Sequence, residues 1–283
     1  MKVQLNILKR LNATITNTIF CVYQLLLLRL FAKRKMKILF SNKQDWKDFI
    51  KKGFQFTPHL VTFGELSAEN FKDYDLVMPL TIRDLKYLNE THNPIQHNPV
   101  PIPSTKTILL CDDKYLFNQC LIDNGFGEFV PKMGGTQTFP YILKKKIDEW
   151  GANTHIISDA QQEQNVTEIL NDPKYFTQGL ITGSTEYATH VFFKDQNIVC
   201  AINIKYAFEI GTPIKGKDKA IYEKICHCPY LELFSSILSA IDFEGICCIN
   251  YKVHDNRPFI IEINPRFGGS LCPYFFSFLR HVN

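Results

Sequence analysis

The stretch of sequence that decides the fold lies near the C-terminus and reads Arg257-Pro258-Phe259-Ile260-Ile261-Glu262-Ile263-Asn264-Pro265-Arg266-Phe267-Gly268-Gly269-Ser270. Its apolar run predicts a buried strand that is interrupted by Glu262, and a buried charge is costly unless something pairs with it. Strand side chains alternate between two faces, so Glu262 and Asn264 point the same way. Side-by-side oxygens of this kind suit Mg²⁺ when it also holds substrate phosphates. A structural ion pair at a strand end is the alternative explanation of Glu262.

Two features follow this strand. Arg266 continues the polar series just past Pro265, and Gly268-Gly269 lets the backbone turn closely around a bound group. With these features, Glu262 to Arg266 resembles the metal-binding strand of the ATP-grasp superfamily, in particular its carbamoyl-phosphate-synthase-like and carboxylate–amine ligase members. The resemblance implies an α/β (α+β) chain with an ATP-grasp fold and a small preceding parallel α/β domain.

The composition narrows the class of protein. A length of 283 residues suits two or three small subdomains. The net charge of +4 is mild, and the scattered Lys and Arg form no basic stripe with interleaved aromatics, which argues against nucleic-acid binding. An odd number of cysteines, nine, and no recognisable cleavable signal favour a reducing cytoplasm.

The N-terminal segment leaves several interpretations open. Residues 14–32 carry one charge, Arg29, and basic residues flank them on both sides. Nineteen helical residues would span roughly 28 Å, close to a bilayer core. Threonines and asparagine dilute the apolarity, so an interfacial helix or a helix packed on a partner competes with a membrane span. Residues 1–35 also read as an extension upstream of a folded unit that starts at Met36.

From Met36 the pattern alternates between strands and helices, which implies a parallel sheet. We expect strands at 38–40, 60–63 and 75–79, and helices at 45–52, closed by Gly53, and at 82–89. Four prolines between Asn93 and Pro103 mark a linker. The expected division is an extension at 1–35, a leading α/β domain at 36–103, a first ATP-grasp subdomain at 104–178 and a second, with the metal site, at 179–283.

The first ATP-grasp half offers two lysines. Lys114 begins a helix capped by Gly125, and a helix N-terminus favours anions. Lys144 ends the expected strand 141–144, ahead of Lys145 and Lys146. The resemblance implies that Lys114 and Lys144 contact ATP phosphates. The family's glycine-rich lid is reduced here to one glycine, in the shortened lid 151–154.

The hinge between the two halves is the next match. The resemblance implies that Gln178, Gly179, Leu180 and Ile181 lie along the adenine edge, although relatives often have Glu at the first of these positions. It also implies that Glu186 binds the ribose hydroxyls.

The last match is the metal site. Residues 255–258 predict a hairpin that sets Asn250 opposite the Glu262 strand. The resemblance implies metal ligation by Asn250, Glu262 and Asn264. Relatives usually carry Asp, Glu or Gln where this chain has Asn250, so Glu262 would supply most of the negative charge. Catalytic roles fall to Arg266 and Lys205, each near the transferred phosphoryl group.

The implied function is that of an enzyme, an ADP-forming ligase that uses ATP and Mg²⁺ (or Mn²⁺) to join a carboxylate to an amine through an acyl phosphate. The alternatives are an ATP-dependent phosphotransferase and a catalytically weak nucleotide-binding module. The expected partners are small-molecule carboxylates and amines and no nucleic acid. Peripheral membrane contact through residues 14–32, homo-oligomerisation and a cytoplasmic, membrane-associated location complete the expectation.

Overall fold

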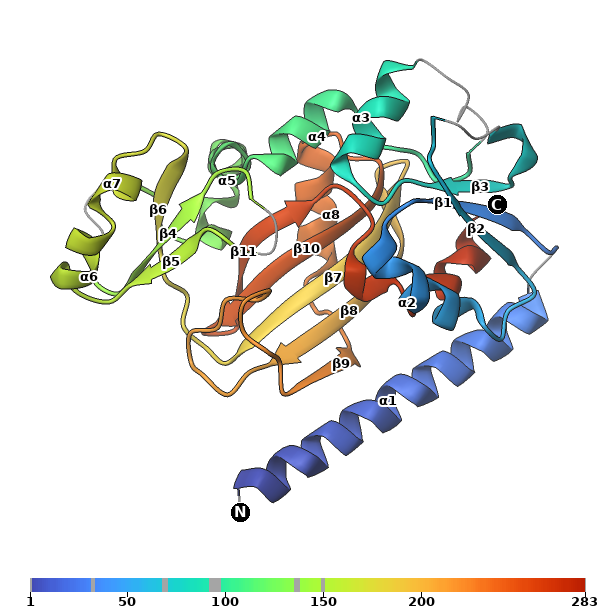
Figure 1. Cartoon of the computed structure of the whole chain (residues 1–283), viewed down its shortest axis with the longest axis horizontal. Helices are drawn as coiled ribbons and strands as arrows, with labels where there is room; N and C mark the ends of the chain where they lie inside the picture. Colours follow the sequence, from blue (N-terminus) through green and yellow to red (C-terminus); the bar gives the residue numbers. More distant parts are fainter. Residues whose placement is uncertain are drawn as a thin grey trace.

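The computed structural model describes residues 2–31, 34–67, 71–91, 98–134, 138–148 and 151–282. Three sheets organise these residues (Figure 1). Part of the proline-rich segment expected as a linker, residues 92–97, lies outside the described residues, as do residues 149–150 just before the expected lid.

The leading sheet is parallel, as the alternation of elements predicts. Its strand order is β2 (Leu60–Gly64), β1 (Lys37–Ser41), β3 (Leu76–Met78). Helix α2 (Gln44–Phe54) connects β1 to β2, and helix α3 (Ile82–Glu90) follows β3. The short turn Phe71–Asp73 precedes β3.

The expected end of α2 at Gly53 is wrong, because the helix continues through Phe54. A Cβ at Gly53 would lie 2.8 Å from the carbonyl oxygen of Pro273. The glycine therefore allows the C-terminal segment to pack directly on α2, which is a tertiary requirement and not a helix stop.

The second sheet is small and antiparallel. Its strand order is β5 (Thr154–Ile157), β4 (Tyr141–Lys145), β6 (Tyr175–Gly179). Helices α6 (Ala160–Asn165) and α7 (Thr167–Leu170) connect β5 to β6. Tyr141, Leu143 and Ile157 form its small core with partly buried residues of α7.

The third sheet has five antiparallel strands in the order β11-β10-β7-β8-β9. Their bounds are β7 (Thr185–Lys194), β8 (Asn197–Ala207), β9 (Tyr222–Cys226), β10 (Gly245–His254) and β11 (Arg257–Asn264). Asp255 and Asn256 both have positive φ, at 49° and 59°, as a two-residue hairpin turn requires. The register pairs Asn250 with Glu262, as predicted.

Helices cover one face of this sheet, namely α4 (Thr105–Asp112), α5 (Lys114–Leu121) and α8 (Leu231–Ala240). Their apolar residues share a core with the sheet around Phe117, Phe234 and Tyr251. Short helical turns at Ile122–Phe126 and Gly127–Phe129 follow α5. Gly125 has φ 83° there, consistent with its predicted role as a helix cap.

The other face of the sheet meets the leading domain and the C-terminal segment. A second large core contains Phe40 of β1, Trp46 of α2, and Phe267 and Phe275 near the C-terminus. The Phe40 ring lies 6.0 Å from that of Phe267 and 5.7 Å from that of Phe275. The C-terminal turns Gly269–Leu271 and Phe275–His281 therefore join the leading sheet to the large sheet.

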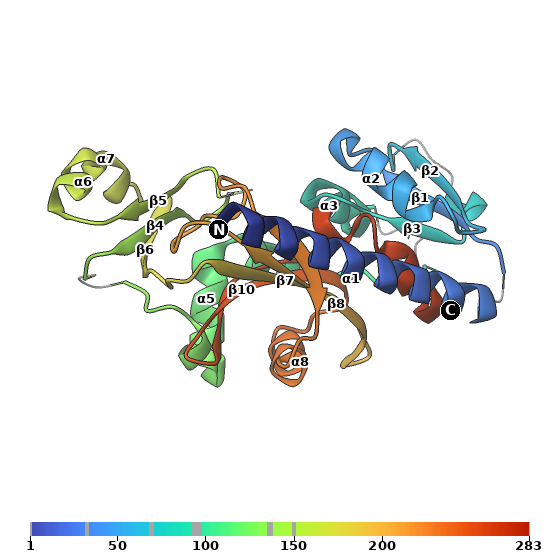
Figure 2. The same cartoon turned by 90° about the horizontal axis from the view of Figure 1, so that it is seen from below.

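The N-terminal segment forms one long helix, α1 (Lys2–Phe31), that runs along one side of the molecule (Figure 2). It contacts β9 and the turn Phe275–His281. One face of α1 therefore packs on the folded core of the same chain. The stretch Gln4–Leu30 is long and apolar enough to cross a membrane by length and composition alone.

Candidate active site

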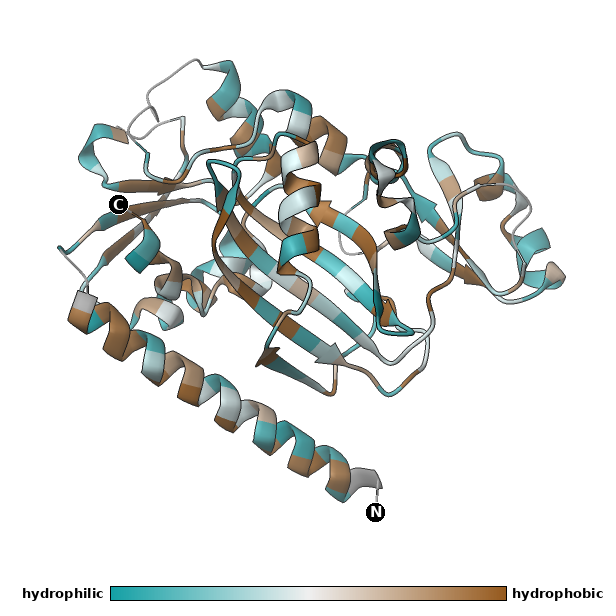
Figure 3. Ribbon diagram, turned by 180° about the vertical axis from the view of Figure 1, so that it is seen from behind, coloured by the Kyte–Doolittle hydropathy of each residue, from teal (hydrophilic) through white to brown (hydrophobic). Residues whose placement is uncertain are grey.

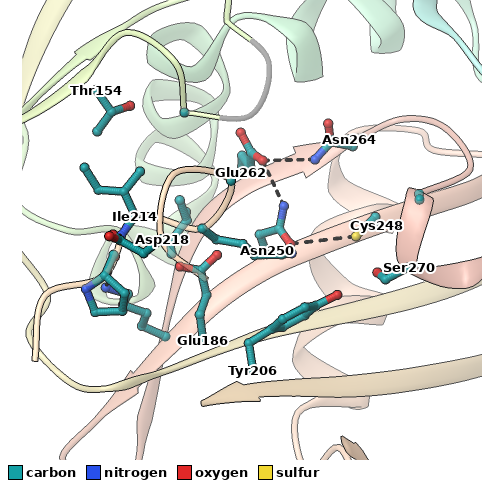
Figure 4. Close-up of a pocket in the computed structure, with 18 of the residues that line it drawn as sticks. Thr154, Glu186, Tyr206, Ile214, Asp218, Cys248, Asn250, Glu262, Asn264 and Ser270 are labelled. Atoms are coloured by element: carbon teal, nitrogen blue, oxygen red, sulfur yellow. Dashed lines mark hydrogen bonds between the residues drawn. The ribbon is translucent and has the colours of Figure 1, made fainter. Parts of the chain in front are cut away.

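A pocket of about 670 Å³ opens on the face of the large sheet that carries Glu262 (Figure 4). Its walls come from the small sheet, the large sheet, the loop 213–218 and the turn after β11. The structure brings together eleven of the predicted site residues in its lining: Lys114, Lys144, Gln178, Gly179, Leu180, Ile181, Glu186, Asn250, Glu262, Asn264 and Arg266.

Glu262 lies at the centre of a polar cluster on β10 and β11. Its Oε1 accepts hydrogen bonds from Asn250 Nδ2 at 2.8 Å and from Asn264 Nδ2 at 3.1 Å. Lys114 Nζ lies 3.4 Å from Oε2. Burial alone would raise the pKa of Glu262, but Lys114 and the two amide donors outweigh it and hold the pKa at about 2. The carboxylate is therefore ionised throughout the physiological range.

The donor set around Glu262 fits Mg²⁺ of the kind that retains waters and shares phosphate oxygens. It comprises one carboxylate and two amides on one sheet face, and rotating either amide by a half-turn would present its Oδ1 instead of its Nδ2. Within the described ranges no three His, Cys, Asp or Glu side chains form a metal cage. The residues thus suit a phosphate-bound hard cation better than a metal held by protein ligands alone.

The three consecutive lysines at the end of β4 differ in direction. Lys144 is buried and its Nζ donates to Gln178 Oε1 at 2.8 Å, whereas Lys146 Nζ lies over the Tyr115 ring at 4.9 Å. Burial, aided by Lys114 and Lys252, lowers the pKa of Lys144 to about 8, against the opposing attraction of Glu262. Of the three consecutive lysines, Lys144 is the one that lines the pocket.

The hinge residues leave the small sheet at β6. Gln178 is fully buried and its Nε2 donates to Pro131 O at 3.3 Å, while Gly179 N donates to Lys132 O at 2.8 Å. Leu180 and Ile181 continue past the strand along the pocket wall. Because the Gly179 N–H already donates within the protein, the backbone groups of Leu180 and Ile181 are the ones that could hydrogen-bond a planar ring in the pocket.

Glu186 lies on β7, on the same sheet face as Asn250. It is 5% exposed, and burial raises its pKa, although Lys215 and Lys252 act in the opposite direction. Figure 4 shows Glu186 beneath the Glu262–Asn250 cluster, separated from Asn264 by Asn250.

Lys205 is the exception among the predicted residues, and its expected position beside the phosphoryl group is corrected by the structure. On β8 its neighbour Tyr206 faces the pocket, so Lys205 points to the opposite sheet face, where its Nζ lies 5.8 Å from the Tyr187 ring centroid. Adjacent residues of a strand lie on opposite faces of the sheet. The sequence pattern alone did not show which face Lys205 occupies.

Two other lysines, which the sequence analysis missed, occupy the pocket. Lys215 Nζ donates to Asn250 Oδ1 at 2.7 Å and lies 4.5 Å from the Tyr206 ring centroid. Lys252 Nζ donates to Pro213 O at 3.1 Å. Lys252 could have been found by strand alternation from Asn250, two residues earlier, whereas Lys215 comes from a loop with no periodic signal.

The Gly268-Gly269 turn is held by two large side chains. A Cβ at Gly268 would lie 2.5 Å from His190 Cε1, and one at Gly269 would lie 3.1 Å from Trp46. His190 Nε2 is 2.8 Å from Ser270 Oγ, and burial lowers the pKa of His190 to about 3, so the ring is neutral. Gly268 is therefore required by packing, whereas a side chain at Gly269 would need Trp46 to move by a few tenths of an ångström. Ser270 is held at the pocket rim.

The chain is distantly similar in sequence to a curated protein. No protein-family model matches the chain. An uncharacterized protein of Methanocaldococcus jannaschii is 24% identical over 226 residues, 74% of this chain and 49% of that protein. The chain thus spans about half the length of this curated relative.

Solved structures give the clearer result. An L-amino acid ligase from Bacillus licheniformis superposes with a TM-score of 0.59 at 16% identity, covering 87% of this chain and 71% of the ligase. A D-alanine–D-alanine ligase from Bacillus anthracis, complexed with ATP, gives 0.55 at 15% identity, covering 82% and 87%. An N5-carboxyaminoimidazole synthetase from Staphylococcus aureus, complexed with ADP, gives 0.55 at 13%, covering 84% and 73%. The predicted ATP-grasp fold is confirmed.

Proposed function

We propose that this chain is an ADP-forming ligase that joins a carboxylate to an amine through an acyl phosphate. The observation that carries the proposal is the pairing of an ionised Glu262, flanked by two amides, with Lys114, Lys144 and Lys215 in one pocket. A carboxylate–amide set beside several cations matches the needs of a polyphosphate and its counter-ion. The likeness to solved ligases supplies the fold and supports the reaction class as an analogy.

In this proposal the nucleotide lies between the small and large sheets. Lys114 and Lys144 hold the phosphates, residues 178–181 contact the adenine, and Glu186 takes the ribose hydroxyls. Glu262, Asn264 and Asn250 would hold Mg²⁺ or Mn²⁺, which supplies positive charge to the phosphate oxygens. Lys215, hydrogen-bonded to Asn250, adds a cation at the same place.

The chemistry follows from positioning and charge. A carboxylate oxygen of the acid substrate attacks the γ-phosphorus, the bond to the β-phosphate oxygen breaks, and ADP leaves. The amine nitrogen then attacks the acyl carbon, phosphate leaves, and the nitrogen loses a proton. Arg266 steadies the transferred phosphoryl oxygens, and no side chain of the protein forms a covalent bond.

A panel of carboxylates and amines, read out by phosphate release, tests the proposal. A ligase releases phosphate only when both substrates are present and forms an amide in equal amount. A stable phosphorylated product would identify a phosphotransferase instead. ATP binding without turnover would identify a weak nucleotide-binding module, an alternative favoured by the neutral Asn250 in place of a second acid.

Further parts of the proposal concern organisation and location. We assign residues 36–103 to a leading domain, 104–178 to the first ATP-grasp subdomain and 179–283 to the second, with 1–35 as an N-terminal extension. Small-molecule acids and amines would be the substrates, and a cytoplasmic, membrane-associated homo-oligomer the working form. Analytical ultracentrifugation of the full chain would test the oligomeric state.

A further inference from the structure

Helix α1 presents two opposite rows of residues. The inward row, which faces the protein, contains Ala13, Asn17, Phe20, Gln24 and Leu28. The outward row contains Leu8, Leu11, Ile15, Ile19, Val22, Leu26 and Leu30. We propose that the outward row docks flat on an anionic lipid surface while the inward row stays bound to the protein.

Specific contacts hold the inward face on the large sheet. Asn17 donates to Glu223 O at 3.0 Å and accepts from Ile225 N at 2.9 Å, so it pairs with the free edge of β9 as another strand would. Arg10 Nε donates to Ile221 O at 2.9 Å. The Phe20 ring meets Tyr274 edge-on at 6.1 Å, and Leu28 is buried in the main core. A transbilayer orientation of α1 would break these contacts, whereas an in-plane orientation keeps them.

The outward row is apolar and uncovered. Its seven residues are each 50–75% exposed. Figure 3 shows apolar residues recurring along the length of the helix. A row of seven exposed apolar side chains along one side of a helix is typical of an interaction site.

The charges of the segment select the occupant. Residues 1–35 contain seven Lys or Arg and no Asp or Glu, and the basic residues cluster near both ends of α1. Arg10 and Arg34 have partners in the protein, while Lys9 and Arg29 are exposed and Arg29 lies beside the row. An apolar helix face with basic flanks is the composition that binds anionic membrane interfaces in the plane of the surface.

The spacing of the outward row argues against a left-handed coiled coil with a second copy of the helix. From Leu8 to Leu30 the steps are three, four, four, three, four and four residues, an average of about 3.7. That average stays close to the 3.6 residues per turn of a straight helix, so the row runs straight along one side. A left-handed coiled coil between two copies requires a repeat of 3.5 instead.

Docking in this orientation places the pocket near the lipid. Glu223 of β9, to which α1 binds, lines the pocket, as does Ala220 just before that strand. Tyr274, which contacts Phe20, also lines it. Only the thickness of one helix, roughly 10 Å, would then separate this wall from the membrane surface. The inference does not depend on the reaction proposed above.

Flotation of the full chain with vesicles tests the proposal. The full chain should float with vesicles of equal parts phosphatidylcholine and phosphatidylglycerol, and binding should weaken as salt is raised. The triple variant Leu11→Gln, Ile15→Gln, Val22→Gln should bind about tenfold more weakly or worse. The matched control Leu109→Gln, Leu116→Gln, Ile122→Gln removes exposed apolar side chains elsewhere and should bind like the unaltered chain.

A second measurement covers the case in which the triple variant fails to fold. Ile19→Trp adds a fluorophore on the outward row to the native Trp46 and Trp150. Brominated phosphatidylcholine mixed with phosphatidylglycerol should quench this variant more strongly than the unaltered chain. No flotation, equal binding to phosphatidylcholine alone, or quenching no stronger than that of the unaltered chain would each overturn the proposal. So would a full chain that is dimeric through α1 and becomes monomeric in the triple variant without any vesicle binding.

Discussion

Among single residues, Glu262 carries the largest share of the argument. It is ionised in a pocket because Lys114 and two amides compensate its burial. Its position could be predicted from the sequence because a lone acid in an apolar strand has few explanations. The sequence could not show how far the carboxylate is already neutralised by its neighbours, since Lys114 lies 148 positions earlier in the chain.

We predict that Glu262→Gln lowers ATP turnover by about a hundredfold or more, because it removes the anion that would hold the metal. The fold should remain, since Gln keeps the shape and can still pair with Asn250 and Asn264. Circular dichroism shows whether the variant is folded, and phosphate release measures its rate of ATP turnover. Turnover near that of the unaltered chain in Mg²⁺ would refute the metal assignment.

The stability of the chain should also depend on pH through Glu262. Its pKa in the folded state, about 2, is below the ordinary value of 4.5. The ionised form therefore stabilises the fold above about pH 4.5, and this stabilisation disappears as the pH falls toward 2. As the pH is lowered across this range, the melting temperature should fall less steeply for Glu262→Gln than for the unaltered chain. Equal pH dependence of the two melting temperatures would contradict the contacts of Glu262 with Lys114 and the two amides.

Lys144→Ala should weaken ATP binding by about tenfold to a hundredfold, since a hydrogen bond to a charged group is worth roughly 1.5–3 kcal/mol. Lys145→Ala is the matched control and should bind ATP nearly unchanged, because that side chain does not line the pocket. Affinity should also decline above pH 8, as Lys144 loses its proton. Calorimetric titration measures both effects, and equal losses at the two positions would mean that the end of β4 was misread.

Alanine variants of Lys215 and Lys205 compare a lysine inside the pocket with one outside it. Lys215→Ala should reduce turnover by about tenfold or more, because its ammonium lies against Asn250 at the proposed metal site. Lys205→Ala should leave turnover almost unchanged, because its side chain lies on the opposite sheet face. A larger loss at Lys205 than at Lys215 would restore the original expectation for Lys205.

Among the elements, those defined by local patterns were the ones that the sequence could predict. The leading parallel strands and the β10–β11 hairpin follow from apolar runs bounded by turn residues. The packing of Gly53 on Pro273 and the entry of Lys215 into the pocket follow from contacts between distant segments. No local periodicity encodes such contacts.

Helix α1 is the element whose removal is most informative. If residues 1–35 are an extension, as their sequence suggests, a chain beginning at Met36 should fold and bind ATP as the full chain does. The buried Leu28 alone contributes roughly 2 kcal/mol, which predicts a melting temperature lower by about 4–8 °C for the shorter chain. Differential scanning calorimetry measures the shift, and equal melting temperatures would show that the inward row adds nothing.

For the whole molecule, the essential arrangement is the meeting of the small sheet and the large sheet around one pocket, with α2 of the leading domain beside them. The small sheet brings Lys144 and Gln178, and the large sheet brings Glu186, Asn250 and Glu262. The C-terminal turns join the large sheet to the leading domain. The order of these parts along the chain could be predicted from the resemblance. Their convergence required the structure, because strand faces and loop paths are set by the assembled cores.

The central claim, that this pocket activates a carboxylate as an acyl phosphate, has one direct test. An acid substrate labelled with ¹⁸O in its carboxylate is incubated with ATP, Mg²⁺, its amine partner and the full chain, and the released phosphate is analysed by mass spectrometry. The account predicts one ¹⁸O atom in each phosphate, because the attacking carboxylate oxygen leaves with it. Unlabelled phosphate formed together with amide would contradict the account.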